Sequence, residues 1–191
     1  HTAHGTASDA DNRYLWRQNP RRLQAEAMRD AVLATSGKLN FKAGGSGYRD
    51  FKYTETYAPI YRYITPDTPD LWRRSIYRFV VRTTPHEFLT ILDCPDPANL
   101  TPKRLTTTTP LQALTLSNNP FMLTQVGYFA ERLKQDASAK TADQIDRAFR
   151  LALSRQPTPA EAKAALQTVR DKGLFALCLA LLNVNEFAYV D

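Results

Sequence analysis

The chain has 191 residues, of which 43% are hydrophobic and 23% are charged, so it is long enough to bury a core and too balanced for a disordered protein. No stretch approaches the roughly 20 consecutive apolar residues of a transmembrane helix, which predicts that no segment spans a membrane. The formal charge of +6 is scattered along the chain without a nucleic-acid reader motif, which argues against nucleic-acid binding.

The N-terminal part begins with small polar residues and then becomes helical. Residues 1–12 lack hydrophobic periodicity and are predicted to be a connector. Over residues 20–36 apolar side chains recur at helical spacing, and Gly37 follows where helices often end in a left-handed conformation. We therefore expect a helix over residues 20–36.

Residues 44–65 carry a different pattern, because aromatic side chains recur near period two after a glycine-rich connector. Pro59 interrupts this run, and proline cannot donate to a strand ladder, so an edge strand or two short strands are expected instead of one long strand. Residues 74–83 alternate similarly and are predicted to add a strand, although this run could also open on a helical turn. We expect a small antiparallel sheet of two or three strands.

Three segments share the pattern Thr-Pro-x-Glu/Gln, which begins at Thr84, Thr109 and Thr158. In such a capping box the threonine hydroxyl accepts from the amide three residues on, the Glu or Gln reaches back, and proline suits the first helical position. A fourth box, without the proline, begins at Thr141. The caps and the apolar stripes that follow them predict helices at residues 85–92, 110–117, 120–135, 142–154, 159–171 and 173–187.

These elements predict a fold class that is mainly α, a helical bundle with a small antiparallel β element. Residues 13–191 are expected to form a single mainly helical domain, which could divide into sub-lobes at residues 13–135 and 136–191. The last helix is apolar on nearly all sides, which places it in the middle of the bundle and Cys178 in the core.

The chain has two cysteines, Cys94 and Cys178, and neither belongs to a CxxC or CxxCH motif. We therefore expect no metal site and no haem in this chain. A disulfide between them is permitted if the chain is extracytoplasmic, but no spacing indicates one. His86 is predicted to face solvent at the start of a helix, because no second histidine or cysteine lies near it in the sequence.

Four segments resemble one known family. They are residues 11–26 (DNRYLWR followed by RRLQAE), 73–79 (RRSIYRF) with 92–96 (LDCPD), 108–121 (TTPLQAL running into NNPF) and 182–191 (LNVNEFAYVD). In order and spacing they resemble the C-terminal PSD-one type domain of unknown function in secreted, multi-domain cytochrome c-type proteins of planctomycetes and related bacteria. The resemblance implies an extracytoplasmic location (periplasmic or secreted), upstream domains of the same parent protein as partners, and haem only in those other domains.

Paired carboxylates stand in a proline-rich loop at Asp93 and Asp96. Two such acids could carry out general acid/base chemistry if burial separated their pKa values. Aspartates beside proline also commonly bind turn amides or pair with arginine. The residues leave both roles open, and no catalytic residue is assigned.

Arginines and asparagines flank this loop. If the segment around Tyr77 folds against the helix at residues 110–117, they could line a groove for an anionic or hydroxyl-rich ligand such as a sulfated polysaccharide. The alternative is that the charges pair with one another. At least two of four arginines (Arg73, Arg74, Arg82 and Arg104) are then expected within salt-bridge reach of Asp93 or Asp96. The candidate ligand-binding residues are Arg73, Arg74, Tyr77, Arg82, Asp93, Asp96, Arg104, Asn118 and Asn119.

Three functions are compatible with this sequence. The first is a non-catalytic accessory domain of an exported cytochrome-type protein, which binds polysaccharide or docks on upstream domains. The second is a carbohydrate-active enzyme domain with a site around Asp93, Asp96 and Arg104. The third is a purely structural packing module. A polar pocket with unpaired carboxylates would favour the enzyme, and a broad exposed apolar patch would favour docking.

Overall fold

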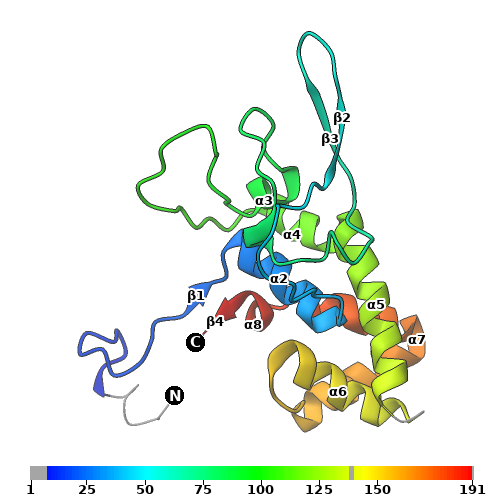
Figure 1. Cartoon of the computed structure of the whole chain (residues 1–191). Coiled ribbons are helices and arrows are strands. Elements are labelled where there is room, and N and C mark those ends of the chain that lie inside the picture. The colour runs from blue at the N-terminus through cyan, green and yellow to red at the C-terminus, as the bar shows by residue number, and fades with distance from the viewer. Residues whose placement is uncertain (1–7, 138–139, 191) are drawn as a thin grey trace.

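The computed structural model describes residues 8–137 and 140–190, which form a mainly helical fold with two small antiparallel β pairs (Figure 1). The predicted fold class is therefore confirmed. Most of the expected connector at residues 1–12 lies outside the described residues, and the division into sub-lobes at 13–135 and 136–191 stays a prediction. Within the described part of the chain, no helix has the length and apolar character needed to cross a membrane.

Four helices build the core by packing against one another: α2 (Ala25–Ser36), α5 (Pro120–Asp136), α6 (Thr141–Leu153) and α7 (Pro159–Asn183). Each turns apolar side chains inward, and Leu33, Phe129 and Ile145 are among the buried residues. Burial of one such side chain contributes about 1.5–3 kcal/mol. The shorter helices α3 (Glu87–Ile91), α4 (Pro110–Asn118) and α8 (Asn185–Ala188) pack along this core.

Two of the predicted capping boxes are confirmed. The Thr109 hydroxyl accepts from the amide of Gln112 at the start of α4, and the Thr158 hydroxyl accepts from the amide of Glu161 at the start of α7. In both boxes the N3 side chain also accepts from the threonine amide, and proline occupies the first turn. Both helix starts are therefore specified locally.

The boxes at Thr84 and Thr141 are wrong. Helix α3 begins at Glu87, and its N-cap is His86, whose side chain accepts from the Leu89 amide. The carbonyl of Thr84 instead accepts from the Tyr63 hydroxyl at 2.6 Å, a tertiary contact made before the helix begins. Thr141 is already the first residue of α6, after an N-cap at Lys140.

Helix α2 is shorter than predicted, because residues 21–22 form a strand. Strand β1 (Arg21–Arg22) pairs antiparallel with β4 (Tyr189–Val190). At the other end of α2, Gly37 has φ of +78°, as expected for a helix end. Within α7, Gly173 has φ of +82° and breaks the helical conformation, so the two helices predicted at 159–171 and 173–187 correspond to the halves of α7 and to α8.

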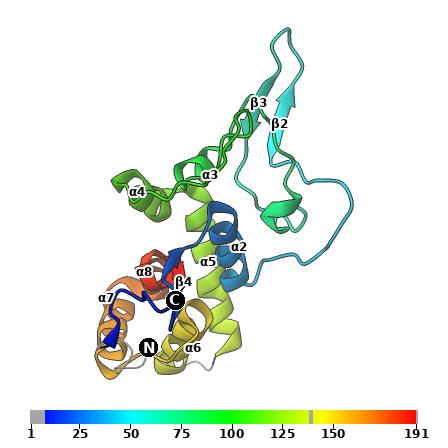
Figure 2. The same ribbon diagram turned by 90° about the vertical axis from the view of Figure 1, so that its left-hand side faces the viewer.

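A two-stranded hairpin projects from the helical body (Figures 1 and 2). Its strands are β2 (Phe51–Thr54) and β3 (Ile60–Tyr63), which pair antiparallel with Phe51 opposite Tyr63. Of the two alternatives at Pro59, an edge strand or two short strands, the structure has the two short strands. The strand predicted over residues 74–83 is wrong: the segment opens with the short 3-10 helix η1 (Ser75–Tyr77), the alternative that the sequence allowed, and then makes one isolated bridge from Arg78 to Tyr48.

The described part of the chain contains both cysteines, and both are free thiols. Cys178 lies on α7 with 0% of its surface exposed, which confirms its predicted place in the core. Burial raises the pKa of this thiol to about 12. Cys178 is therefore a protonated, packed side chain.

Candidate functional site

The candidate arginines at positions 73 and 74 hold the fold together. Arg73 is buried, and its guanidinium donates to the carbonyls of Lys42, Gly44 and Ser46 while lying 4.5 Å from the centre of the Tyr77 ring. Arg73 thus fixes the glycine-rich segment that leads to the hairpin, and Tyr77 supports it.

Arg74 is exposed and makes a 3.5 Å ion pair with Asp30 of α2. The same carboxylate accepts from the Ser75 amide and hydroxyl at 2.8 and 2.7 Å. Asp30 therefore anchors η1 to α2, and Arg74 adds a solvent-facing contact.

Asp93 is the centre of a polar network that joins four segments of the chain. Its Oδ2 atom is 2.7 Å from Nη2 of Arg22 on β1, and it also accepts from the amide of Thr107 and the side chain of Gln112. Its Oδ1 atom accepts from the Thr107 hydroxyl at 2.7 Å. Arg22 extends the network to Gln112 Oε1 at 2.8 Å and to the carbonyls of Leu92 and Thr107.

This network sets the ionisation of Asp93. Burial raises the pKa of the carboxyl, but the hydrogen bonds from Thr107 and Gln112 and the charge of Arg22 outweigh burial and hold that pKa below its usual value. A carboxylate occupied by four donors is suited to joining segments, and it is poorly placed to exchange protons with a substrate.

The predicted pairing of the aspartates with flanking arginines is wrong. In the described part of the chain, neither Asp93 nor Asp96 forms an ion pair with Arg73, Arg74, Arg82 or Arg104. Asp96 is exposed and instead accepts from the amide of Ala98 and the side chain of Asn99. Asp96 therefore stabilises its own turn, and Arg82 is exposed.

Arg104 reaches back to helix α2. Its two terminal nitrogens lie 2.8 and 2.9 Å from the carboxylate oxygens of Glu26, which is a bidentate pair. Burial raises the pKa of Glu26, but Arg104 reverses this effect and keeps the pKa below its usual value. The pair attaches the long loop between α3 and α4 to α2. This loop extends away from the helices in Figure 1.

The two asparagines lie apart from this loop network, at the junction of α4 and α5. Asn119 caps α5, since its Oδ1 accepts from the Phe121 amide at 2.9 Å. Asn118 is exposed at the last residue of α4. The nine candidate residues therefore do not form one site. Asp93 instead meets Gln112, which was not a candidate, and most of the other candidates make separate structural contacts.

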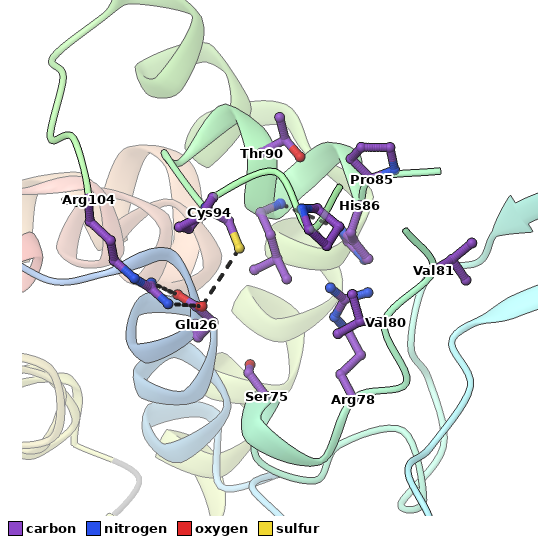
Figure 3. Close-up of a pocket in the computed structure, with 13 residues that line it drawn as sticks. Glu26, Ser75, Arg78, Val80, Val81, Pro85, His86, Thr90, Cys94 and Arg104 are labelled. Atoms are coloured by element: carbon purple, nitrogen blue, oxygen red, sulfur yellow. Dashed lines mark hydrogen bonds and ion pairs between the residues drawn. The ribbon is translucent and has the colours of Figure 1, made fainter. Parts of the chain in front are cut away.

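Two cavities flank the Arg104–Glu26 pair. A groove of about 580 Å³ is lined by Arg21, Arg22, Asp93, Arg104 and Tyr189, with apolar residues between them. The wall of a smaller cavity, of about 200 Å³, contains Glu26, Arg78, His86, Cys94 and Arg104 (Figure 3). Arg104 lines both.

His86 and Asp50 form a buried pair that sequence reasoning missed. His86 Nε2 is 3.4 Å from Asp50 Oδ2, the Asp50 side chain is 0% exposed, and that of His86 is 12% exposed. Because His86 Nδ1 accepts from the Leu89 amide, the ring proton belongs on Nε2 and faces Asp50. The prediction of a solvent-facing His86 is wrong. No local pattern links these residues, which the hairpin brings together.

The hairpin has an aromatic face and a basic face. Cross-strand pairing places Phe51, Tyr53, Tyr61 and Tyr63 on one face, and their rings contact one another at centroid distances of 5.3 to 6.0 Å. The other face has Lys52 directly opposite Arg62. We call these the aromatic face and the basic face of the hairpin.

Much of this hairpin is open to solvent. The Tyr53 side chain is 52% exposed, and Tyr57 is fully exposed at the tip. Isolated two-stranded hairpins are marginal in water, and the aromatic stacking supports this one. Exposed aromatic side chains of this kind are typical of binding surfaces.

No group of three or more His, Cys, Asp or Glu side chains among the described residues could hold a metal ion. The fold and these surfaces define a helical domain with a projecting aromatic hairpin. The family model for PSD1, a protein of unknown function (DUF1553), matches residues 1–169. The chain belongs to this family. Searches of curated proteins and of solved structures found no match.

Proposed function

We propose that this chain is a non-catalytic accessory domain of an exported cytochrome-type protein, and that it binds an anionic polysaccharide through the hairpin. The observation that carries this proposal is that two exposed tyrosines, Tyr53 and Tyr57, and the basic face lie on one projecting element. In this proposal the domain works outside the cytoplasm, other domains of the parent carry haem, and those upstream domains are its partners.

The exposed tyrosines of the hairpin provide flat, amphipathic surface. Tyrosine combines an apolar ring with a polar hydroxyl, so Tyr53 and Tyr57 can stack on the apolar face of a sugar ring while the hydroxyl reaches its polar groups. The exposed position of both rings on a projecting element suits a long polymer, which would pass over the hairpin instead of entering a closed pocket.

The basic face supplies the preference for negative charge. Residues 41–63 contain four basic and two acidic side chains, and one of the acids, Asp50, is fully buried. Like charges directly opposite one another destabilise a strand pair, so Lys52 and Arg62 gain when a carboxylate or sulfate group binds between them. A neutral polymer offers no such gain.

The Asp93 network does not favour the carbohydrate-active enzyme. Its carboxylate is occupied by Arg22, Thr107 and Gln112. Asp96 binds its own turn, and both terminal nitrogens of Arg104 are paired with Glu26. A hydrolytic site needs a carboxyl group that is free to give or take a proton. A binding role requires none.

The test is affinity electrophoresis of the full chain through gels that contain a sulfated, a uronate-containing or a neutral polysaccharide. We expect retention by the two anionic polymers, and this retention should fall as salt increases. The double variants Tyr53→Ala/Tyr57→Ala and Lys52→Gln/Arg62→Gln should each lose it, with unchanged circular dichroism because all four side chains are exposed.

A matched control removes the same charge elsewhere. Arg170 and Lys172 are exposed on α7, at the opposite end of the molecule from the hairpin (Figure 1), and Arg170→Gln/Lys172→Gln should retain full binding. If this control lost binding to the same extent, the loss in Lys52→Gln/Arg62→Gln would come from net charge alone. Absence of retention for the unaltered chain would reject polysaccharide binding and favour the packing module.

A further inference from the structure

The small cavity beside the Arg104–Glu26 pair has a charge imbalance in its wall. Figure 3 shows Arg104 and Glu26 joined on one side of the cavity, and Arg78 on another side, below His86. Because Arg104 and Glu26 neutralise each other, Arg78 is left as the uncompensated charge in the lining.

The guanidinium of Arg78 is only partly satisfied within the protein, where it interacts with the Tyr63 side chain. Among the described residues, no carboxylate lies within salt-bridge distance of its guanidinium, and its Nη1 atom is buried without a hydrogen-bond partner. Asp50, the nearby buried acid, faces His86 instead. A buried guanidinium nitrogen without an acceptor, and a charge without a counter-ion, cost folding free energy, which an anion bound at Arg78 would offset.

The rest of the cavity is mostly apolar. Its apolar lining consists of Val80, Val81, Pro85, Leu89, Pro95 and Pro97. A hydrated dianion such as inorganic phosphate would lose its water against this surface without compensation, whereas a small organic acid can place its carboxylate at the arginine and its apolar body against these side chains. The volume of about 200 Å³ is below that of pockets for drug-sized ligands.

We propose that this cavity binds a small organic carboxylate through Arg78. The site is distinct from the hairpin surface, because none of the exposed hairpin residues at positions 52, 53, 57 and 62 lines the cavity. It shares neither variants nor probe with the polysaccharide experiment, so either proposal can fail while the other stands.

The test is an NMR titration of the full, isotope-labelled chain with sodium benzoate, with benzamide as the neutral analogue and inorganic phosphate as the simple oxyanion. We expect saturable shift changes by benzoate at the amides of Val80, Thr90 and Cys94, and none by benzamide. Arg78→Gln should weaken benzoate binding roughly tenfold or more, because a charge-assisted contact is lost.

Two further variants keep the result interpretable. Arg82→Gln removes an exposed arginine from the same segment and should leave benzoate binding unchanged. Thr90→Trp fills the cavity from its rim without changing charge, since Thr90 is exposed and lines the cavity. It should abolish benzoate binding, and it provides an independent test in case Arg78→Gln fails to fold.

Three outcomes would overturn the proposal. They are the absence of saturable shifts around the cavity with benzoate, equal affinity for benzoate in Thr90→Trp, and phosphate binding as tight as benzoate binding. The last result would show a general oxyanion site in place of one for organic carboxylates.

Discussion

Replacement of Asp93 by asparagine tests the claim that this residue joins segments of the fold. Asp93 has φ of +67°, a left-handed conformation that asparagine also tolerates, so Asp93→Asn adds no backbone strain. The amide keeps one oxygen for the contacts of Oδ2, and its nitrogen can donate to the Thr107 hydroxyl in place of Oδ1. The substitution therefore removes mainly the negative charge beside Arg22.

The cost follows from the burial of the pair. The side chains of Arg22 and Asp93 are only 9% and 16% exposed, so water replaces the lost charge poorly. Hydrogen bonds to charged groups contribute about 1.5–3 kcal/mol, and we expect a loss of about 2 kcal/mol in the free energy of unfolding. For a chain of this size this corresponds to a fall in Tm of about 4–8 °C.

The assay is urea denaturation and calorimetry, with Asp96→Asn as the matched control. Asp96 is exposed and binds only its own turn, so its replacement should cost less than about 0.5 kcal/mol. Polysaccharide retention should be unchanged in both variants. Equal stability of the two variants would refute the network argument. Loss of polysaccharide retention in Asp93→Asn alone would show that Asp93 takes part in ligand binding.

Three further predictions concern single residues. Thr158→Ala should cost about 1 kcal/mol in denaturant unfolding, whereas Thr84→Ala, which removes no cap, should be near neutral; equal costs would contradict the assignment of caps. Thiol reagents should spare Cys178 under native conditions, because it is buried and its pKa is raised to about 12, and rapid native labelling would contradict its place in the core. Hydrogen bonding to Arg155 lowers the pKa of Glu161 from 4.5 to about 2, so the stability that this carboxylate contributes is present above pH 4.5 and lost as pH falls toward 2. If Glu161→Gln lost stability between these pH values as steeply as the unaltered chain, this reasoning would be contradicted.

The sequence by itself determined the elements whose cause is local. The boxes at Thr109 and Thr158 start α4 and α7, because a cap involves residues within three positions of one another. The apolar stripes placed α5, α6 and the first half of α7, because helical periodicity alone fixes which residues share a face. The burial of Cys178 followed from a last helix that is apolar on nearly all sides. Pro59 likewise excluded one long strand, because proline cannot donate to a strand ladder.

Only the tertiary structure decided the polar contacts and the local exceptions. Thr84 does not cap because α3 begins only at Glu87, behind an N-cap at His86. Residues 21–22 leave the predicted helix because they pair with the C-terminal strand. The partner of Asp93 is Arg22, 71 positions away in the chain. Ion pairs between such distant residues depend on how the loops pack against the helices in the folded chain. No spacing in the sequence encodes that distance, so the charges could be recognised in advance but their partners could not.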